Sequence, residues 1–207
     1  MGFSVSVRLK SKAGEGELLA VGRGSAPRPS AADLRRLVTR AKTGDQDAVD
    51  ALYRLHVDRI YAYLAANVGN PHDAEDLTTQ TFMRMIESLG RFQPRSTPFA
   101  AWLFRIARNL AIDHFRAAAR AARARTQPVT PRDGSAEDEA LTVLDREMLR
   151  GELATLPLGQ REVLTLKFVC GLTNAEVASV LGKTEGAVKA LERRALRALQ
   201  RRPIRAA

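Results

Sequence analysis

Cysteine, tryptophan and aromatic side chains are scarce in this chain of 207 residues, which holds one cysteine, one tryptophan and 5% aromatic residues. A single cysteine excludes a disulfide framework, and we interpret Cys170, which lies in an apolar run, as a core residue. The apolar runs are far shorter than the roughly 20 residues that span a bilayer, and no signal peptide is evident. We therefore expect no membrane insertion, a cytoplasmic location, and small helical cores rather than a large sheet.

Positive charge is abundant and unevenly distributed along the chain, whose formal net charge is +10. Residues 105–132 hold seven arginines and one acid, residues 133–152 hold seven acids and two arginines, and residues 183–205 hold eight bases and two acids. Two basic segments thus flank an acidic connector. This pattern favours a polyanionic partner such as DNA, bound with an affinity that falls steeply as salt rises.

The pattern of residues 172–199 is typical of a helix-turn-helix. Thr173, followed three residues later by Glu176, predicts a capping box that starts one helix. Gly182 permits a sharp turn, and Thr184 can cap the second helix. That second helix is rich in cations, which suits a position in the DNA major groove beside phosphates. An ordinary helical hairpin with a solvated basic face is the alternative.

Four helices are predicted before this unit. Ser30 can cap the first helix, and the second helix follows residues 44–45 and ends near Gly69. The pairs 70–71 and 97–98 each place a capping residue before a proline, and they are predicted to start the third and fourth helices. Residues 1–29 lack periodicity and are expected to form a disordered leader. The predicted core stripe of the third helix comprises Leu77, Thr81, Phe82, Met85, Ile86 and Leu89. That of the fourth comprises Phe99, Trp102, Leu103, Ile106 and Leu110, with Trp102 interpreted as a core anchor rather than a stacking platform.

Two blocks of motifs resemble bacterial sigma factors of the extracytoplasmic-function (ECF) type, a branch of the sigma-70 family. The run Asp73-Ala74-Glu75-Asp76-Leu77 and the run 99–113, which reads FAAWLFRIARNLAID, are similar to region 2 of these proteins. The segments 156–157, 160–164, 175–178 and 185–189 are similar to their region 4. The blocks stand in the family's order, and the likeness extends over residues 33–199.

The resemblance implies an all-α chain of two small helical domains joined by a flexible linker. The implied boundaries are a disordered leader at 1–29, region 2 at 30–119, a flexible acidic linker at 120–145, region 4 with the helix-turn-helix at 146–202, and a tail at 203–207. Region 2 would recognise and melt the minus-ten promoter element, and region 4 would recognise the minus-thirty-five element. No additional C-terminal regulatory domain is expected.

By resemblance, the chain would bind RNA polymerase core, direct promoter-specific initiation and catalyse nothing itself. Its partners would be the clamp helices of the largest polymerase subunit, the polymerase flap for region 4, promoter DNA and a separate anti-sigma factor. The implied core-binding residues are Asp76, Gln80, Arg84 and Glu87. The implied minus-ten residues are Arg91, Gln93, Arg95, Arg105, Arg108, Asn109 and Arg116. The implied minus-thirty-five residues are Lys183, Thr184, Glu185, Lys189, Arg193, Arg194 and Arg197.

Two places in the sequence depart from the family pattern. Thr79 and Gln80 stand where many relatives have a glutamine followed by an acid, which bears on the details of core contact. Lys183 follows the turn at a position where helix-turn-helix units often bury an apolar residue. The aliphatic stem of Lys183 can cover that position while its ammonium reaches a phosphate.

Two other classes of protein remain as alternatives. A stand-alone operator-binding regulator would use the same helix-turn-helix but leaves the segment 99–116 unexplained. An enzyme acting on nucleic acid would need a nucleophile, a base or metal ligands, yet His56, His72 and His114 have no metal-ligand spacing and no phosphate-binding glycine loop occurs. The acids at 73–76 suit a helix start. We therefore expect no enzyme activity, no metal and no cofactor.

Overall fold

Helices form the secondary structure of the computed structural model, which describes residues 29–94, 97–124 and 151–201. The helices are α1 (Ala31–Lys42), α2 (Gln46–Val68), α3 (Pro71–Leu89), α4 (Phe99–Ala124), α6 (Leu158–Leu164), the π-helical turn η1 (Thr165–Val169), α7 (Asn174–Leu181) and α8 (Glu185–Gln200). No strand occurs in these ranges, so the predicted all-α class is confirmed. Within them, no helix has both the length and the apolar character needed to cross a bilayer.

Several predicted segments lie outside the described residues. These are the expected leader apart from residue 29, the part of the expected linker at 125–145, residues 146–150 and 202 of the expected region 4, the expected tail, and Arg95. The segment 120–124, which the sequence assigns to the linker, is instead helical, because α4 continues to Ala124.

Side-chain caps begin the first three helices where the sequence predicts them. The Ser30 hydroxyl accepts a hydrogen bond from the Asp33 amide at the start of α1. Asp45 caps α2 in the same way, and that helix ends at Gly69, whose φ is 84°. Asn70 caps α3, whose first residue is the expected proline. Each cap satisfies an amide that would otherwise lack a partner, which stabilises a helix by about 1 kcal/mol.

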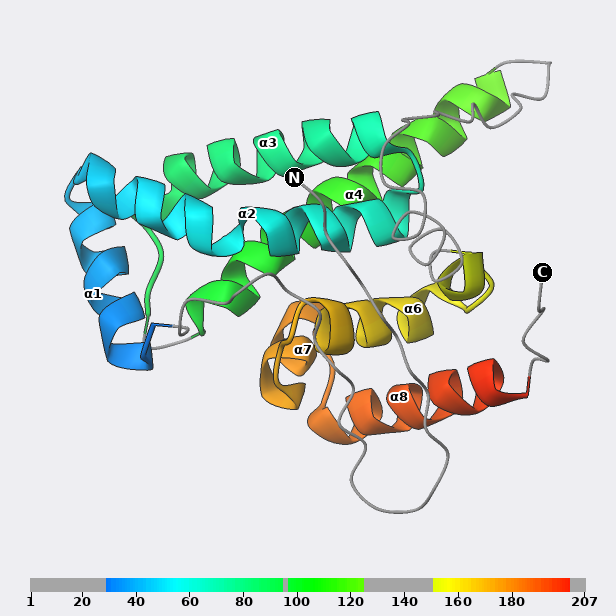
Figure 1. Cartoon of the computed structure of the whole chain (residues 1–207). Coiled ribbons are helices and arrows are strands. Elements are labelled where there is room, and N and C mark those ends of the chain that lie inside the picture. The colour runs from blue at the N-terminus through cyan, green and yellow to red at the C-terminus, as the bar shows by residue number, and fades with distance from the viewer. Residues whose placement is uncertain (1–28, 95–96, 125–150, 202–207) are drawn as a thin grey trace, which may run out of the picture.

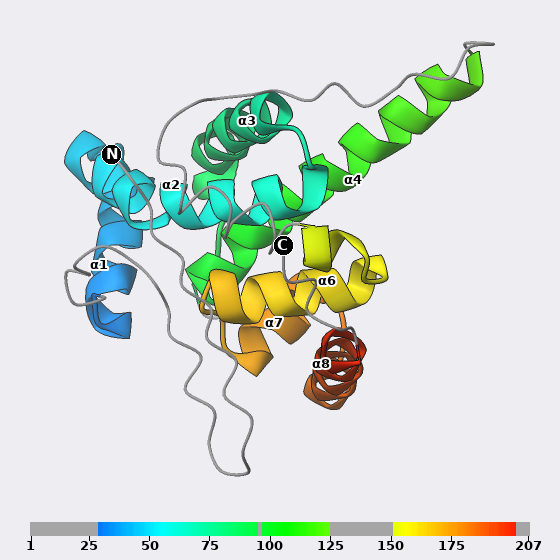
Figure 2. The same ribbon diagram turned by 45° about the vertical axis from the view of Figure 1, so that its right-hand side comes forward.

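The longest of the described helices, α4, contacts α2, α3 and α7. Its first half packs within the bundle, while its C-terminal part extends beyond the other helices (Figures 1 and 2). The Pro98 carbonyl accepts a hydrogen bond from the Trp102 amide at 3.0 Å, so Pro98 occupies the cap position. Thr97 therefore stands one residue before the position that the sequence analysis assigns to it.

The core of α1 to α4 contains most of the predicted stripes. The largest fully buried side chains of this part are Val38, Leu52, Ile60, Tyr63, Leu64, Met85, Leu103 and Phe104. Ile86 is 57% exposed, so its assignment to the core was wrong. Helical periodicity gives the direction of a buried face but not its width, and Ile86 lies beyond the edge of this one.

The helix-turn-helix formed by α7 and α8 is present as the sequence predicts. Thr173 and Glu176 form a reciprocal capping box at the start of α7. Gly182 follows that helix with a left-handed φ of 62°, a conformation that glycine adopts without steric cost. Thr184 then caps α8, and Val188 is fully buried.

One continuous cluster of buried side chains runs through both halves of the chain. It joins the core of α1 to α4 to Val163, Leu166, Cys170 and Val177 from the C-terminal half. Contacts of α4 with α7, and of α2 with η1, carry this continuity (Figure 1). Cys170 is buried, as predicted. The two expected domains are thus packed against each other, which the sequence analysis does not predict.

Candidate nucleic-acid interface

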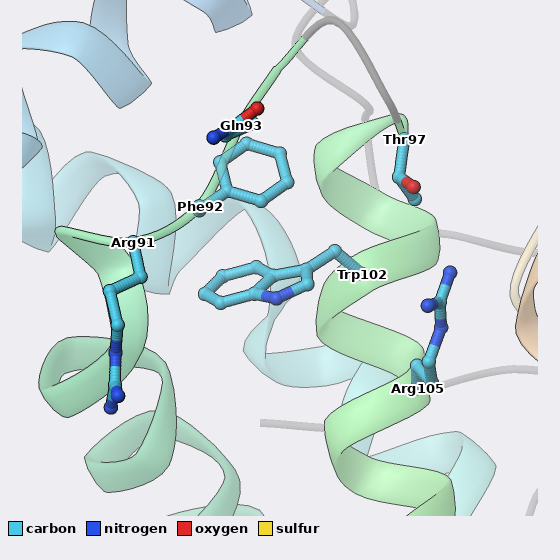
Figure 3. A pocket seen from close by; sticks show the side chains of 6 residues that line it. All are labelled: Arg91, Phe92, Gln93, Thr97, Trp102 and Arg105. Carbon is cyan, nitrogen blue, oxygen red and sulfur yellow. The ribbon is translucent and has the colours of Figure 1, made fainter.

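An open hollow of about 240 Å³ lies between the segment that follows α3 and the start of α4 (Figure 3). The residues that line it are Arg91, Phe92, Gln93, Thr97, Trp102 and Arg105. The rings of Phe92 and Trp102 lie across its middle, with centroids 4.7 Å apart. The two arginines stand on opposite sides of these rings (Figure 3). Cations around an aromatic face suit a backbone phosphate beside an unstacked base.

The wall of the hollow is fixed from several helices. Lys42 of α1 donates a hydrogen bond from Nζ to the Phe92 carbonyl at 2.8 Å. The buried Phe92 ring packs edge-on against Phe99, with centroids 5.6 Å apart. Trp102, which is half-buried, also contacts Phe99 at 5.6 Å. Trp102 is therefore anchored in the core, as predicted, and also lines the hollow.

A neutral histidine supports this wall from α2. The His56 ring packs edge-on against Phe99 with centroids 5.3 Å apart, and Nδ1–H donates to the Leu52 carbonyl at 2.9 Å. Burial lowers the pKa of His56 to about 4. The imidazole is therefore uncharged at neutral pH and serves as packing rather than as a cation for DNA.

The predicted minus-ten residues of α4 occupy different places along the helix. Arg105 lines the hollow, and Asn109 and Arg116 follow on the same helical face, both exposed. At a rise of about 1.5 Å per residue, Arg116 lies about 16 Å further along α4 than Arg105. Arg108 lies on an adjacent face, where its side chain is 24% exposed and bound to Glu162. Of these four residues, Arg105 alone lines the hollow.

The solvent-facing side of the helix-turn-helix is basic. All of the predicted minus-thirty-five residues are exposed: Lys183, Thr184, Glu185, Lys189, Arg193, Arg194 and Arg197. At about 100° per residue, Arg193 lies opposite the buried Val188 and Ala195, while Arg194 lies to one side. Within the described part of the chain, none of these bases is paired with a carboxylate. The face can therefore meet phosphates without first breaking an ion pair.

The predicted core-binding residues form an exposed stripe along α3. Asp76, Gln80, Arg84 and Glu87 are all exposed, and Arg84 lies 3.6 Å from Glu87 in an exposed ion pair. Met83 lies within the same stripe and is 56% exposed. A polar face that contains an exposed apolar side chain suits a protein partner better than DNA. Sequence reasoning missed Met83, and the exposure of Ile86 beside this stripe was hidden by its assignment to the core.

A buried carboxylate connects the two halves of the chain. Glu162 of α6, whose side chain is 5% exposed, accepts hydrogen bonds from Arg108 Nε at 2.7 Å and Nη2 at 3.4 Å. The Tyr63 hydroxyl of α2 donates to the same carboxylate at 3.3 Å. Burial, together with the negative charge of Glu162, raises the pKa of Tyr63 well above its usual value. The tyrosine therefore remains a hydrogen-bond donor to Glu162.

Three further hydrogen bonds cross the same contact. Arg59 Nε of α2 donates to the Cys170 carbonyl at 2.8 Å, and Arg105 Nη2 donates to the Ser179 hydroxyl of α7 at 3.1 Å. The Cys170 thiol donates a hydrogen bond to the Arg59 carbonyl at 3.4 Å, and burial raises the pKa of this thiol to about 12. Sequence reasoning missed this network. The available signal is the charge of Glu162 beside the apolar residues Val163, Leu164 and Leu166, because a charge at a buried face requires a partner.

Comparison with known proteins assigns both halves of the chain to one class of protein. Residues 52–121 match the family model of sigma-70 region 2, and residues 146–199 match that of sigma-70 region 4. The structure of CnrH in complex with the cytosolic domain of CnrY is similar to this fold, with a TM-score of 0.62 and 30% identity over 80% of this chain and 94% of that one. The fold and the matched segments are thus those of sigma-70-type factors.

Curated relatives define the branch of the family. The ECF RNA polymerase sigma factor BldN of Streptomyces coelicolor is 39% identical over 172 residues, which cover 80% of this chain and 64% of BldN. The ECF RNA polymerase sigma factor SigD of Mycobacterium tuberculosis is 32% identical over 170 residues, which cover 79% of this chain and 80% of SigD. This chain therefore belongs to the ECF family of RNA polymerase sigma factors. It spans less than two thirds of the length of BldN.

Family membership bears on the expected lack of catalysis. Sigma factors are non-enzymatic initiation factors, which agrees with the prediction that this chain is not an enzyme. Among the described residues, no group of three or more histidine, cysteine, aspartate or glutamate side chains could hold a metal ion.

Proposed function

We propose that this chain binds RNA polymerase core and directs it to promoters, where it recognises the minus-ten and minus-thirty-five elements and melts the former. The observation that carries the proposal is the hollow beside α4. Two arginines and an aromatic pair surround an open space at the segment matched to sigma region 2. Unpairing a base costs a few kcal/mol, which stacking on an aromatic face and phosphate contacts can offset. No covalent step is required.

Core binding is assigned to the exposed stripe of α3. Asp76, Gln80, Arg84 and Glu87 would contact the clamp helices of the largest polymerase subunit. Their exposure and the nearby Met83, 56% exposed, support a protein contact at this face. Charged pairs at the rim would set orientation and association rate, and the apolar side chain would be buried on docking.

Recognition of the minus-ten element is assigned to the hollow and to α4. Arg91, Gln93 and Arg105 would contact the extruded base and its neighbouring phosphates. The half-buried Trp102, which lines the hollow, would be the stacking surface, a role that the sequence analysis set aside in favour of core packing. Asn109 and Arg116, exposed further along the same face, would follow the DNA backbone beyond the hollow. The proposal also includes Arg95 and Arg108, of which Arg108 must first leave Glu162.

Recognition of the minus-thirty-five element is assigned to α8. Thr184, Glu185, Lys189 and Arg193 would lie nearest the base edges in the major groove, because they occupy the first half and the outward side of this helix. The phosphates on either side would be contacted by Lys183, Arg194 and Arg197. The exposure of all seven side chains supports this arrangement.

The remaining parts of the proposal concern organisation and partners. Region 2 would occupy 30–119 and region 4 would occupy 146–202, with a leader at 1–29, an acidic linker that begins after α4 ends at Ala124 and runs to 145, and a tail at 203–207. Region 4 would contact the polymerase flap, and a separate anti-sigma factor would control the chain in the cytoplasm. The complex of CnrH with the cytosolic domain of CnrY supports a protein partner for this chain, since CnrH has a similar fold.

The experiment that tests this function is gel filtration of the purified chain with bacterial polymerase core in about 0.3 M salt, where surface attraction is screened. Stoichiometric co-elution is expected. A folded, inhibitor-free chain that elutes separately from core would contradict the proposal and favour a stand-alone operator-binding regulator. Binding of duplex DNA by the chain alone, as a dimer, would then identify that regulator.

A further inference from the structure

Lys42, the last residue of α1, is tied to the wall of the hollow. Its Nζ donates a hydrogen bond to the Phe92 carbonyl at 2.8 Å, across 50 residues of sequence. The segment that follows α3 passes beside α1 at this place (Figure 1). The match to sigma-70 region 2 begins at residue 52, so α1 lies before the matched segment. Lys42 thus contacts the hollow from a helix to which the proposed function assigns no part.

The turn between α1 and α2 gives Lys42 a fixed starting point. Arg40 Nε of α1 lies 2.7 Å from Asp45 Oδ2, and Asp45 Oδ1 accepts a hydrogen bond from the Ala48 amide of α2 at 3.1 Å. The Asp45 amide also donates to the Arg40 carbonyl at 3.2 Å. The carboxylate of this turn therefore binds both helices, and Lys42 extends from the turn to the Phe92 carbonyl.

Phe92 is the side chain on which the shape of the hollow depends. Its ring is 5% exposed and lies against Trp102 and Phe99, with centroids 4.7 and 5.6 Å away. The Phe92 amide donates to the Leu89 carbonyl at 3.0 Å at the end of α3, whereas the Phe92 carbonyl accepts from Lys42. A hydrogen bond from a charged donor is stronger than one between neutral groups. Its loss would loosen this segment on the side of α1.

We propose that Lys42 is a positioning residue for the minus-ten element, because it holds Phe92 in place so that the hollow is formed before a base enters. A hollow that is formed only part of the time binds its ligand more weakly by that fraction. Lys42 acts through Phe92 and does not itself touch DNA. The effect on promoters rests on the proposed function, whereas the contact of Lys42 with Phe92 is a property of the free chain.

The single tryptophan of the chain reports the shape of the hollow, because Trp102 lies against Phe92. The first measurement is acrylamide quenching of Trp102 fluorescence in the free full-length chain. Lys42→Met keeps the aliphatic length of the side chain but removes its donors, so Phe92 should leave the indole part of the time. We expect quenching to rise from the wild-type value toward that of the chain in urea, while the helical circular dichroism stays unchanged.

Two further variants separate the hydrogen bond from the charge. Lys42→Arg retains a cationic donor of similar reach, and its quenching should equal that of the wild type. Arg36→Met removes one positive charge from the same helix and breaks an exposed ion pair with Asp33, so it should also match the wild type. If Lys42→Met loses helical signal, Lys42→Ala takes its place, because alanine favours the helix. Equal quenching in the folded Lys42 and Arg36 variants would overturn the proposal.

The second measurement is the affinity of reconstituted holoenzyme for oligonucleotides that carry the minus-ten element as a single strand. The element is taken from a promoter selected on the wild-type holoenzyme. Relative to Arg36→Met, Lys42→Met should bind about 3- to 10-fold more weakly, with the same slope of log affinity against log salt. Equal affinity would overturn the proposal. So would a slope smaller by about 0.7, which would identify a direct contact of Lys42 with one phosphate.

The two measurements keep this proposal separate from the proposed function. Wild-type holoenzyme that binds neither strand would count against the proposed function. The quenching of Trp102 would still decide whether Lys42 holds the hollow, because that assay contains neither polymerase nor DNA.

Discussion

Two adjacent arginines of α8 offer a test of the proposed division between base recognition and phosphate binding. Arg193 and Arg194 are both exposed. Arg193 lies opposite the buried Val188 and Ala195, so it points directly away from the core, while Arg194 is rotated by about 100° toward the side of the helix. In a major groove, the first would face base edges and the second would face a backbone strand.

The two alanine variants are therefore expected to differ in kind. Arg193→Ala should lose about 1 to 3 kcal/mol at the cognate minus-thirty-five element, which is about 5- to 150-fold in affinity, and less at a scrambled element. Arg194→Ala should weaken both DNAs alike. It should also reduce the slope of log affinity against log salt by about 0.9, the contribution of one phosphate contact.

The assay is binding of reconstituted holoenzyme to promoter duplexes at several salt concentrations, with the promoter obtained by selection on the same holoenzyme. Core binding by gel filtration is the control and should be unchanged in both variants. The assignment of Arg193 to base edges is refuted if its alanine variant loses equal affinity for cognate and scrambled elements while the salt slope falls by about 0.9.

Three other predictions test separate parts of the structure. Arg84→Glu should reduce the affinity of the chain for polymerase core, measured by gel-filtration titration. The control is Arg54→Glu, which reverses the charge of an exposed, ion-paired arginine on α2 and should leave that affinity unchanged. Equal effects of the two variants would remove Arg84 from the interface. Folding lowers the pKa of His56 from 6.5 to about 4, so the unfolded chain binds a proton at His56 more tightly than the folded chain does. His56 should therefore leave the free energy of unfolding unchanged above pH 6.5 and lower it progressively as the pH falls, by about 3 kcal/mol at pH 4. Urea unfolding should show this loss, and His56→Leu should lack that part of the pH dependence; an identical pH profile in the variant would contradict the assignment. Thr173→Ala removes the capping box of α7 and should lower the free energy of unfolding by about 1 kcal/mol, and no change in the urea midpoint would contradict that role.

Much of the fold could be predicted because the signals are local. Thr173, Gly182 and Asn70 determine helix ends through hydrogen bonds and backbone angles within a few residues, and each lies where the sequence places it. Ile86 was misassigned because a periodic stripe does not reveal where the buried face ends. Its side chain is 57% exposed.

The contact between the two halves could not be predicted from local patterns. Glu162 and Arg108 are 54 residues apart, and nothing in either segment specifies the other as a partner. The sequence of a helix also does not distinguish a solvated arginine from one that forms an ion pair. Arg108 was therefore predicted to bind DNA together with Arg105 and Asn109. The hollow beside Trp102 likewise depends on the packing of Phe92 and Phe99, which the stripe of α4 alone does not place.

Transcription from fragmented genomic DNA of the source bacterium, with polymerase core and this chain, tests the central claim most directly. The 5′ ends of the transcripts would be sequenced with and without the chain. The account predicts new start sites that depend on the chain and share two sequence elements, about 25 base pairs apart, upstream of each start. Start sites identical to those of core alone, from a chain shown to be folded, would contradict it.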